Sequence, residues 1–150
     1  MEKPRKIVPP VYVLLSIIAM VLLNRYAPLA RVIAPPYSYA GGVLLVLGIA
    51  IAIINATAFR RVGTPVVPFH QSTTLVTTGF YRYTRNPMYI GMVTGLLGIA
   101  ILFGSASAFL PIPVFILIIQ EWFIKGEERF LEEIFDHQYV DFKKRVRRWI

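Results

Sequence analysis

The chain has 150 residues, enough for one domain, and 56% of them are hydrophobic. A soluble domain of this size cannot bury so much apolar surface, because its surface-to-volume ratio is too high, so the composition predicts an integral membrane protein. The absence of cysteine excludes disulfides, a thiol nucleophile and thiolate metal ligands. The two histidines, His70 and His137, lack a partner at metal-ligand spacing, so no metal site is expected.

Four apolar stretches predict membrane-spanning helices. They cover residues 11–28, 39–59, 87–103 and 109–124. A span needs roughly 20 apolar residues, so the second stretch fits well, whereas the third and fourth are short and are expected to thin the bilayer locally or to tilt little. No clear cleavage site follows the basic N-terminus, so the first stretch is interpreted as a retained span and not as a signal peptide. The sequence therefore predicts an all-α, multi-pass transmembrane protein with about four spans.

The distribution of basic residues predicts the orientation of these spans. Fourteen of the sixteen Lys and Arg residues lie in the N-terminal tail, in residues 60–86 or in residues 125–150. The remaining two, Arg25 and Arg31, lie at the end of the first span and in the loop that follows it. The positive-inside rule then places both termini on the cytoplasmic side, and we expect the inner membrane of a prokaryote. The net charge of +8 becomes a topology signal and an attraction to anionic lipid, so no nucleic-acid partner is expected.

The segment before the third stretch has the features of a helix start at the cytoplasmic surface. Asparagine is a favoured N-cap and proline a favoured first helical residue, so Asn86 and Pro87 predict that the helix begins there. A helix N-terminus favours an anion, and the nearby Arg82 and Arg85 suit a carboxylate. A well-capped helix flanked by topogenic arginines is the alternative interpretation.

Three glycines lie within the third predicted span, at Gly91, Gly95 and Gly98. The four-residue spacing of the first two is the small-xxx-small pattern that lets two helices approach closely. Packing against another helix is therefore the favoured interpretation, and close approach by a flat ligand is the alternative.

The cytoplasmic tail contains an amphipathic helix, predicted over residues 123–136. Phe123, Phe130 and Ile134 share its apolar face, Glu127 lies near the centre of that face and Glu128 at its edge. A carboxylate in such a position is costly unless it is paired. The partner is either an arginine before the third span, in a structural ion pair, or a cationic ligand.

These charges together fit one type of ligand. The arginines and the helix start suit a carboxylate, the glutamates suit an ammonium, and Tyr81, Tyr83 and Tyr89 offer ring faces to a sulfonium or an adenine. S-adenosylmethionine has all these groups, although other zwitterions would also satisfy the pattern.

Two segments resemble a known family. Residues 75–91, LVTTGFYRYTRNPMYIG, look like the signature of isoprenylcysteine carboxyl methyltransferases and phospholipid methyltransferases, and the tail from Glu127 to Trp149 is similar to the second block of the same family. The resemblance implies a single membrane methyltransferase domain over residues 1–150, with S-adenosylmethionine under the cytoplasmic ends of the last spans. The implied cofactor-binding residues are His70, Leu75, Val76, Gly79, Tyr81, Arg85, Asn86, Pro87, Tyr89, Glu127 and Glu128.

The candidate catalytic residues are Arg85 and Glu128, which we expect to orient the reactants without a nucleophilic residue. The implied acceptor is a membrane-associated amphiphile, either an isoprenylcysteine-like carboxylate or a lipid amine. Three positions depart from the family pattern: Asn86 replaces the usual His of the carboxyl methyltransferases, Phe80 a proline and Asp136 a glycine. An NADPH-dependent membrane reductase related to sterol reductases and a non-enzymatic membrane scaffold are the alternative functions.

Overall fold

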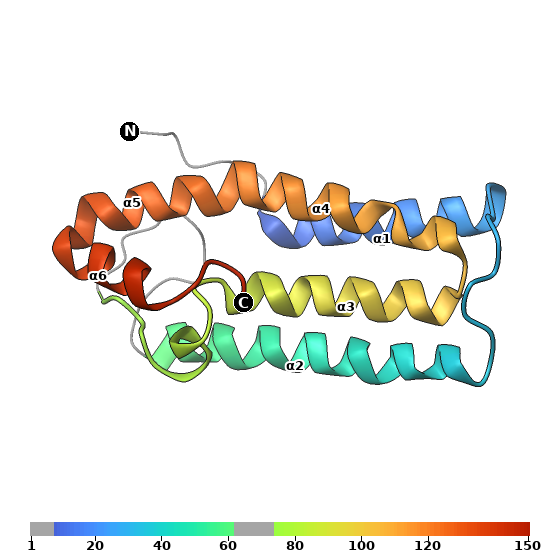
Figure 1. Cartoon of the computed structure of the whole chain (residues 1–150), viewed down its shortest axis with the longest axis horizontal. Coiled ribbons are helices and arrows are strands. Elements are labelled where there is room, and N and C mark those ends of the chain that lie inside the picture. The colour runs from blue at the N-terminus through green and yellow to red at the C-terminus, as the bar shows by residue number, and fades with distance from the viewer. Residues whose placement is uncertain (1–7, 62–73) are drawn as a thin grey trace.

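The computed structural model describes residues 8–61 and 74–150, and this part of the chain is a bundle of helices (Figure 1). The α-helices are α1 Pro9–Tyr26, α2 Ala40–Arg61, α3 Pro87–Phe103, α4 Pro111–Ile119, α5 Lys125–Phe135 and α6 His137–Arg145. Short 3-10 turns cover Tyr37–Tyr39, Gly79–Arg82 and Ala106–Phe109, and a π-helical turn, Gln120–Ile124, joins α4 to α5. The predicted all-α fold is confirmed.

The predicted spans correspond to helices of this bundle. Among the described residues, three helical stretches are long and apolar enough to cross a membrane: Pro9–Tyr26, Tyr37–Ala58 and Ala106–Phe135. The shorter apolar helix Pro87–Phe103 lies alongside them (Figure 1). Large apolar side chains on the outer surface of the bundle, such as Leu14 and Val46, are more than half exposed, as expected where lipid covers them. The chain is an integral membrane protein.

Helices α2 and α3 pack closely through glycines. A methyl group at Gly91 would lie 2.8 Å from the carbonyl oxygen of Gly48, and one at Gly98 would lie 2.6 Å from that of Gly41. Carbon atoms do not approach oxygen so closely, so these positions of the interface admit only glycine. At Gly95, in contrast, the nearest atom to an added methyl group is 3.9 Å away. Helix packing, and not ligand approach, accounts for Gly91 and Gly98.

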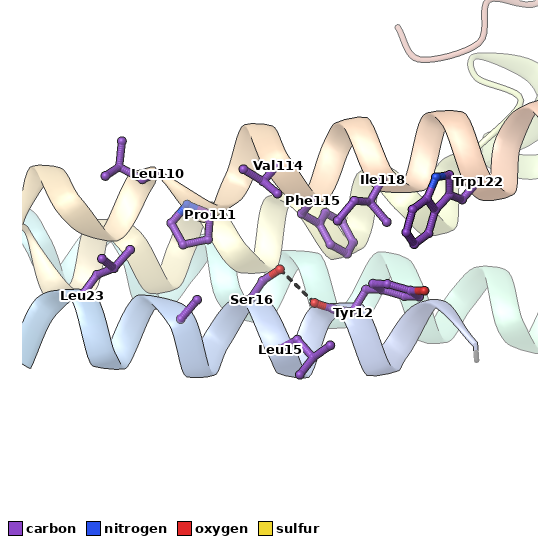
Figure 2. Close-up of a pocket in the computed structure, with 11 residues that line it drawn as sticks. Tyr12, Leu15, Ser16, Leu23, Leu110, Pro111, Val114, Phe115, Ile118 and Trp122 are labelled. Carbon is purple, nitrogen blue, oxygen red and sulfur yellow. Dashed lines mark hydrogen bonds between the residues drawn. The ribbon is translucent and has the colours of Figure 1, made fainter. Parts of the chain in front are cut away.

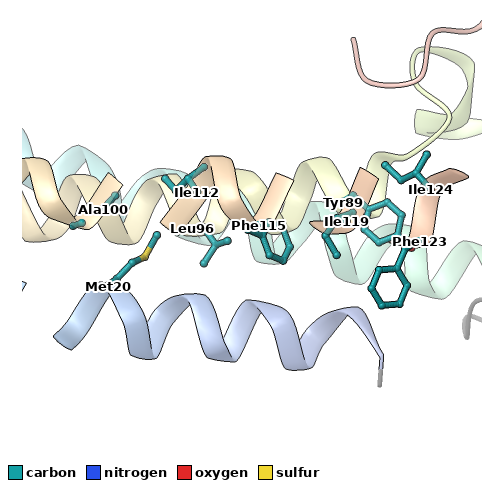
Figure 3. Packing of buried hydrophobic residues seen from close by; sticks show 10 residues of the cluster. Met20, Tyr89, Leu96, Ala100, Ile112, Phe115, Ile119, Phe123 and Ile124 are labelled. Carbon is teal, nitrogen blue, oxygen red and sulfur yellow. The ribbon is translucent and has the colours of Figure 1, made fainter. Parts of the chain in front are cut away.

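The main hydrophobic core lies where α1, α3 and α4 meet. Met20 of α1, Leu96 of α3 and Phe115 of α4 are almost completely buried and point toward one another (Figure 3). Phe123 and Ile124 extend this core toward α5 (Figure 3). The close packing fixes the position of the long C-terminal helical run relative to the start of α3.

The π-helical turn changes which face of α5 is buried. The buried side chains Phe115, Ile119 and Phe123 follow the helical period into the turn. Ile124, the last residue of the turn, is also buried, and Glu128 follows it one period later, because the wider turn accommodates one additional residue and rotates the helix that follows by about 100°. The prediction that Glu128 lies at the edge of the apolar face is therefore wrong: Glu128 is 6% exposed, and Glu127, predicted near the centre of that face, is half-buried against Tyr89.

A second, smaller hydrophobic cluster caps the end of the bundle where α3 begins. It contains Val76, Tyr81, Tyr139, Phe142 and Val146. Helix α6 folds back after a turn at Asp136, whose φ is +41°. The last five residues, 146–150, which we call the C-terminal strap, then return to the start of α3 (Figure 1).

Candidate functional site

The candidate site surrounds the start of α3, where most of the sequence-predicted residues lie. Pro87 is the first residue of α3 and Asn86 occupies the N-cap position. The Asn86 side chain does not cap the helix, however. Its Nδ2 donates a hydrogen bond of 2.9 Å to the backbone carbonyl of Arg148 in the C-terminal strap. The helix start was therefore predicted correctly, but the role of the asparagine side chain was not.

The segment before α3 pairs with the C-terminal strap. The backbone N–H of Arg85 donates to the carbonyl of Arg147 at 2.9 Å, and the Thr84 hydroxyl donates to the carbonyl of Arg148 at 3.2 Å. Thr84 and Arg147 form a parallel bridge. These bonds connect two segments more than sixty residues apart in the sequence and hold the Arg85 backbone in a fixed place.

Glu128 lies between two arginines. Arg148 forms a bidentate pair with it, with Nε 3.0 Å from Oε1 and Nη2 2.7 Å from Oε2. The Nη1 atom of Arg85 lies 3.0 Å from Oε1 on the other side. The side chains of Arg85 and Glu128 are each 9% exposed, and that of Arg148 is 34% exposed. A buried carboxylate needs such partners, and both of its oxygens are occupied by protein groups.

Arg85 retains donors that the described residues do not use. Its Nε and Nη1 are buried and form no aligned hydrogen bond with any described residue, although Nη1 is close to Glu128. The guanidinium also interacts with the phenol of Tyr139. A buried N–H group without an acceptor costs about 1–3 kcal/mol, so this site fits a ligand that supplies one, such as a carboxylate.

Glu127 has a different environment from its neighbour. Its Oε2 accepts a hydrogen bond of 3.2 Å from the hydroxyl of Tyr89, a neutral group. Of the two arginines considered as its partners, Arg85 pairs with Glu128, and Arg82 is exposed. Tyr89 does not neutralise the Glu127 carboxylate, which fits a cationic group of a ligand better than the saturated Glu128 does.

The predicted tyrosines differ in position. Tyr81 and Tyr89 are buried, whereas Tyr83 is 76% exposed and does not join the site. Burial raises the pKa of Tyr81 far above its ordinary value, and the nearby Glu127 charge raises it further. Burial also raises the pKa of Tyr139. These two phenols outside the membrane-spanning helices therefore stay neutral at physiological pH and act as hydrogen-bonding groups and ring surfaces.

The other sequence-predicted residues have mixed positions. Leu75 and Val76 belong to the smaller cluster beside the site, and Gly79 adopts a left-handed φ of +64° in the turn that leads to Tyr81. His70 lies outside the described residues. No group of three metal-binding side chains occurs within residues 8–61 and 74–150.

The main residue that sequence reasoning missed is Arg148. Among protein groups, the sequence pattern predicts only the arginines before α3 as partners of the buried glutamate. The basic residues of the C-terminal strap could have indicated this partner. An arginine there can reach α5 if the chain turns back at Asp136.

Comparisons with known proteins identify the family of this chain. A family model described as Phospholipid methyltransferase matches residues 37–138. An uncharacterized protein of Haemophilus influenzae is 36% identical over 63 residues, which make up 42% of this chain and 100% of that protein. The protein-S-isoprenylcysteine O-methyltransferase of Saccharomyces cerevisiae is 32% identical over 75 residues, 48% of this chain and 30% of the yeast protein.

A probable protein-S-isoprenylcysteine O-methyltransferase of Oryza sativa subsp. indica is 28% identical over 114 residues, 73% of this chain and 58% of the rice protein. The chain thus spans only part of the length of these named relatives. No solved structure matches it significantly. Because the family model covers well over half of the chain, including the segment before α3 and both glutamates, the chain belongs to the phospholipid methyltransferase family.

Proposed function

We propose that this protein transfers a methyl group from S-adenosylmethionine to a membrane-associated amphiphile at the cytoplasmic interface. Two observations near the start of α3 carry the proposal: the buried Nε of Arg85 has no acceptor among the described residues, and the carboxylate of Glu127 is bonded to the neutral hydroxyl of Tyr89 and to no arginine. One group offers a cation and the other an anion, as the amino-acid end of this cofactor requires. Family membership favours a methyl donor for the same place.

The residues of the chain divide the binding task. Arg85 would receive the carboxylate of the cofactor, and Glu127, oriented by Tyr89, would receive its ammonium. The buried ring of Tyr81 offers a surface to the remaining part of the molecule. When bound, S-adenosylmethionine supplies a methyl group on a cationic sulfur that leaves as a neutral thioether.

Glu128 contributes by holding Arg85 in place. Methyl transfer of this kind needs alignment and exclusion of water more than it needs an acid or a nucleophile. The proposed roles of Arg85 and Glu128 are therefore to orient the reactants. The short backbone bonds to the C-terminal strap limit the movement of Arg85 and make such orientation effective.

An apolar groove supports an acceptor with a hydrocarbon part. It runs between α1 and α4 and has a volume of about 440 Å³ (Figure 2). It is lined by Tyr12, Leu15, Ser16, Ala19, Leu23, Leu110, Pro111, Val114, Phe115, Ile118 and Trp122. The Ser16 hydroxyl is bonded to the backbone of Tyr12, so the groove offers little polarity (Figure 2).

The groove ends at Tyr12 and Trp122, whose rings pack edge to face. Trp122 and Glu127 belong to one continuous helical run, about 7 Å apart along its axis. An acceptor whose hydrocarbon chain occupies the groove would therefore place its polar head group near the candidate cofactor site. The names of the relatives and of the family favour two kinds of head group, an isoprenylcysteine-like carboxylate and a lipid amine. Either acceptor could enter laterally from the bilayer.

Titration calorimetry on the purified protein in lipid nanodiscs tests the cofactor. We expect binding of S-adenosylmethionine and of its product S-adenosylhomocysteine, but not of NADPH. Glu127→Gln should weaken binding, whereas Glu133→Gln, the same change at an exposed position of α5, should not. Absence of S-adenosylmethionine binding would refute the proposal, and binding of NADPH instead would favour a reductase.

The acceptor and the orientation need their own measurements. Mass spectrometry of host lipids after incubation with isotopically labelled S-adenosylmethionine should reveal a labelled amphiphile. Reporter fusions at both termini, in a bacterial host, should place them on the cytoplasmic side, as the basic residues predict.

A further inference from the structure

Glu128 is shared unequally by its two arginine partners. Arg148 contacts both carboxylate oxygens, at 3.0 and 2.7 Å, in the geometry of a bidentate pair. Arg85 approaches only one oxygen and forms no aligned hydrogen bond with it. The carboxylate is therefore committed mainly to Arg148, although Arg85 is the more deeply buried of the two arginines.

This unequal sharing has an electrostatic consequence. A guanidinium beside a single carboxylate tends to form a closed bidentate pair, which uses its donors and cancels its charge. Two arginines around one glutamate leave one net positive charge in the group. The buried Nε of Arg85, which has no acceptor among the described residues, shows where this surplus lies.

We propose that Arg148 is a positioning residue, which engages Glu128 so that Arg85 stays available for the carboxylate of an amino-acid ligand. This inference rests on the proposed function. It extends that function to Arg148, a residue beyond those matched by the family model. Without Arg148, the Glu128 carboxylate would turn to Arg85 and compete with the ligand for it.

The C-terminal strap delivers Arg148 by contacts that do not involve its side chain. The carbonyls of Arg147 and Arg148 accept hydrogen bonds from the segment before α3. The Trp149 indole N–H donates to Gln120 at 3.1 Å, and Val146 is buried in the smaller cluster. A substitution of the Arg148 side chain therefore leaves the strap attached.

Two ligands separate this role from a general one. S-adenosylhomocysteine carries the amino-acid end, and 5′-methylthioadenosine has the same adenosine and thioether without it. In nanodiscs, we expect Arg148→Met to lower the affinity for S-adenosylhomocysteine about tenfold or more and to leave that for 5′-methylthioadenosine unchanged. Arg148→Lys should lower the affinity for S-adenosylhomocysteine only a few-fold, because lysine keeps the positive charge but cannot form the bidentate pair. Arg147→Met, at an exposed neighbouring position, is the matched control.

The outcomes are distinguishable. If Arg148→Met loses affinity equally for both ligands, or for neither, the positioning role is overturned and the proposed function is left intact. If the wild-type protein binds neither ligand, the proposed function and the inference both fail. If Arg148→Met does not fold, Arg148→Lys still tests the positioning role. This variant must show a few-fold lower affinity for S-adenosylhomocysteine and an unchanged affinity for 5′-methylthioadenosine.

Discussion

Replacement of Glu128 by glutamine tests the charge group at the centre of the site. The variant keeps the shape of the side chain but removes the negative charge between Arg85 and Arg148, at distances of 2.7–3.0 Å. Breaking a buried ion pair by neutralising one partner costs about 3–5 kcal/mol, because the other charge stays buried. Solvent screens the third of Arg148 that is exposed, so we expect a value near the lower end, about 3 kcal/mol.

Thermal unfolding in nanodiscs measures this effect. For a chain of this size, about 3 kcal/mol corresponds to a fall in the melting temperature of roughly 6–12 °C. Glu133→Gln makes the same chemical change at an exposed position of α5 and should melt with the wild-type protein. A Glu128→Gln variant that melts within about 2 °C of wild type would refute the view that Glu128 balances two buried or half-buried arginines.

Three further substitutions have expected outcomes. Gly48→Leu should abolish the monodisperse folded protein in size-exclusion chromatography, because its side chain would collide with the α3 backbone, whereas Gly42→Leu, at an open position of α2, should not. Ala19→Trp should fill the apolar groove and slow methylation of a long-chain acceptor with unchanged cofactor affinity, while Leu22→Trp on the exposed face of α1 should leave the rate unchanged. Tyr89→Phe removes the hydroxyl that orients the open carboxylate and should weaken cofactor binding about tenfold in calorimetry, and unchanged binding would contradict that role.

The membrane-spanning character of the chain and the approximate positions of its helices can be predicted from the sequence. Long apolar stretches and the proline at position 87 act locally, through the cost of hydrating apolar surface and the fixed φ of proline, so the start of α3 at Pro87 was predictable and its end was predicted only approximately. Glycine spacing likewise predicted the close contact of α3 with another helix. The resemblance of two segments to a methyltransferase family was confirmed by the family match.

The contacts between charged side chains depend on tertiary packing and could not be predicted from the sequence. A regular helical period places Glu127 inward, but the π-helical turn Gln120–Ile124 rotates α5 by one residue and brings Glu128 to the buried face. Asn86 bonds to the strap instead of capping its own helix, and Arg148 reaches Glu128 from twenty residues away. Periodicity and capping preferences describe one helix at a time, whereas these contacts depend on how α5, α6 and the strap pack against the start of α3. Local chemistry therefore predicts the helices and the kinds of charge at the site. Tertiary packing determines which glutamate is paired with two arginines and which arginine keeps a donor without an acceptor.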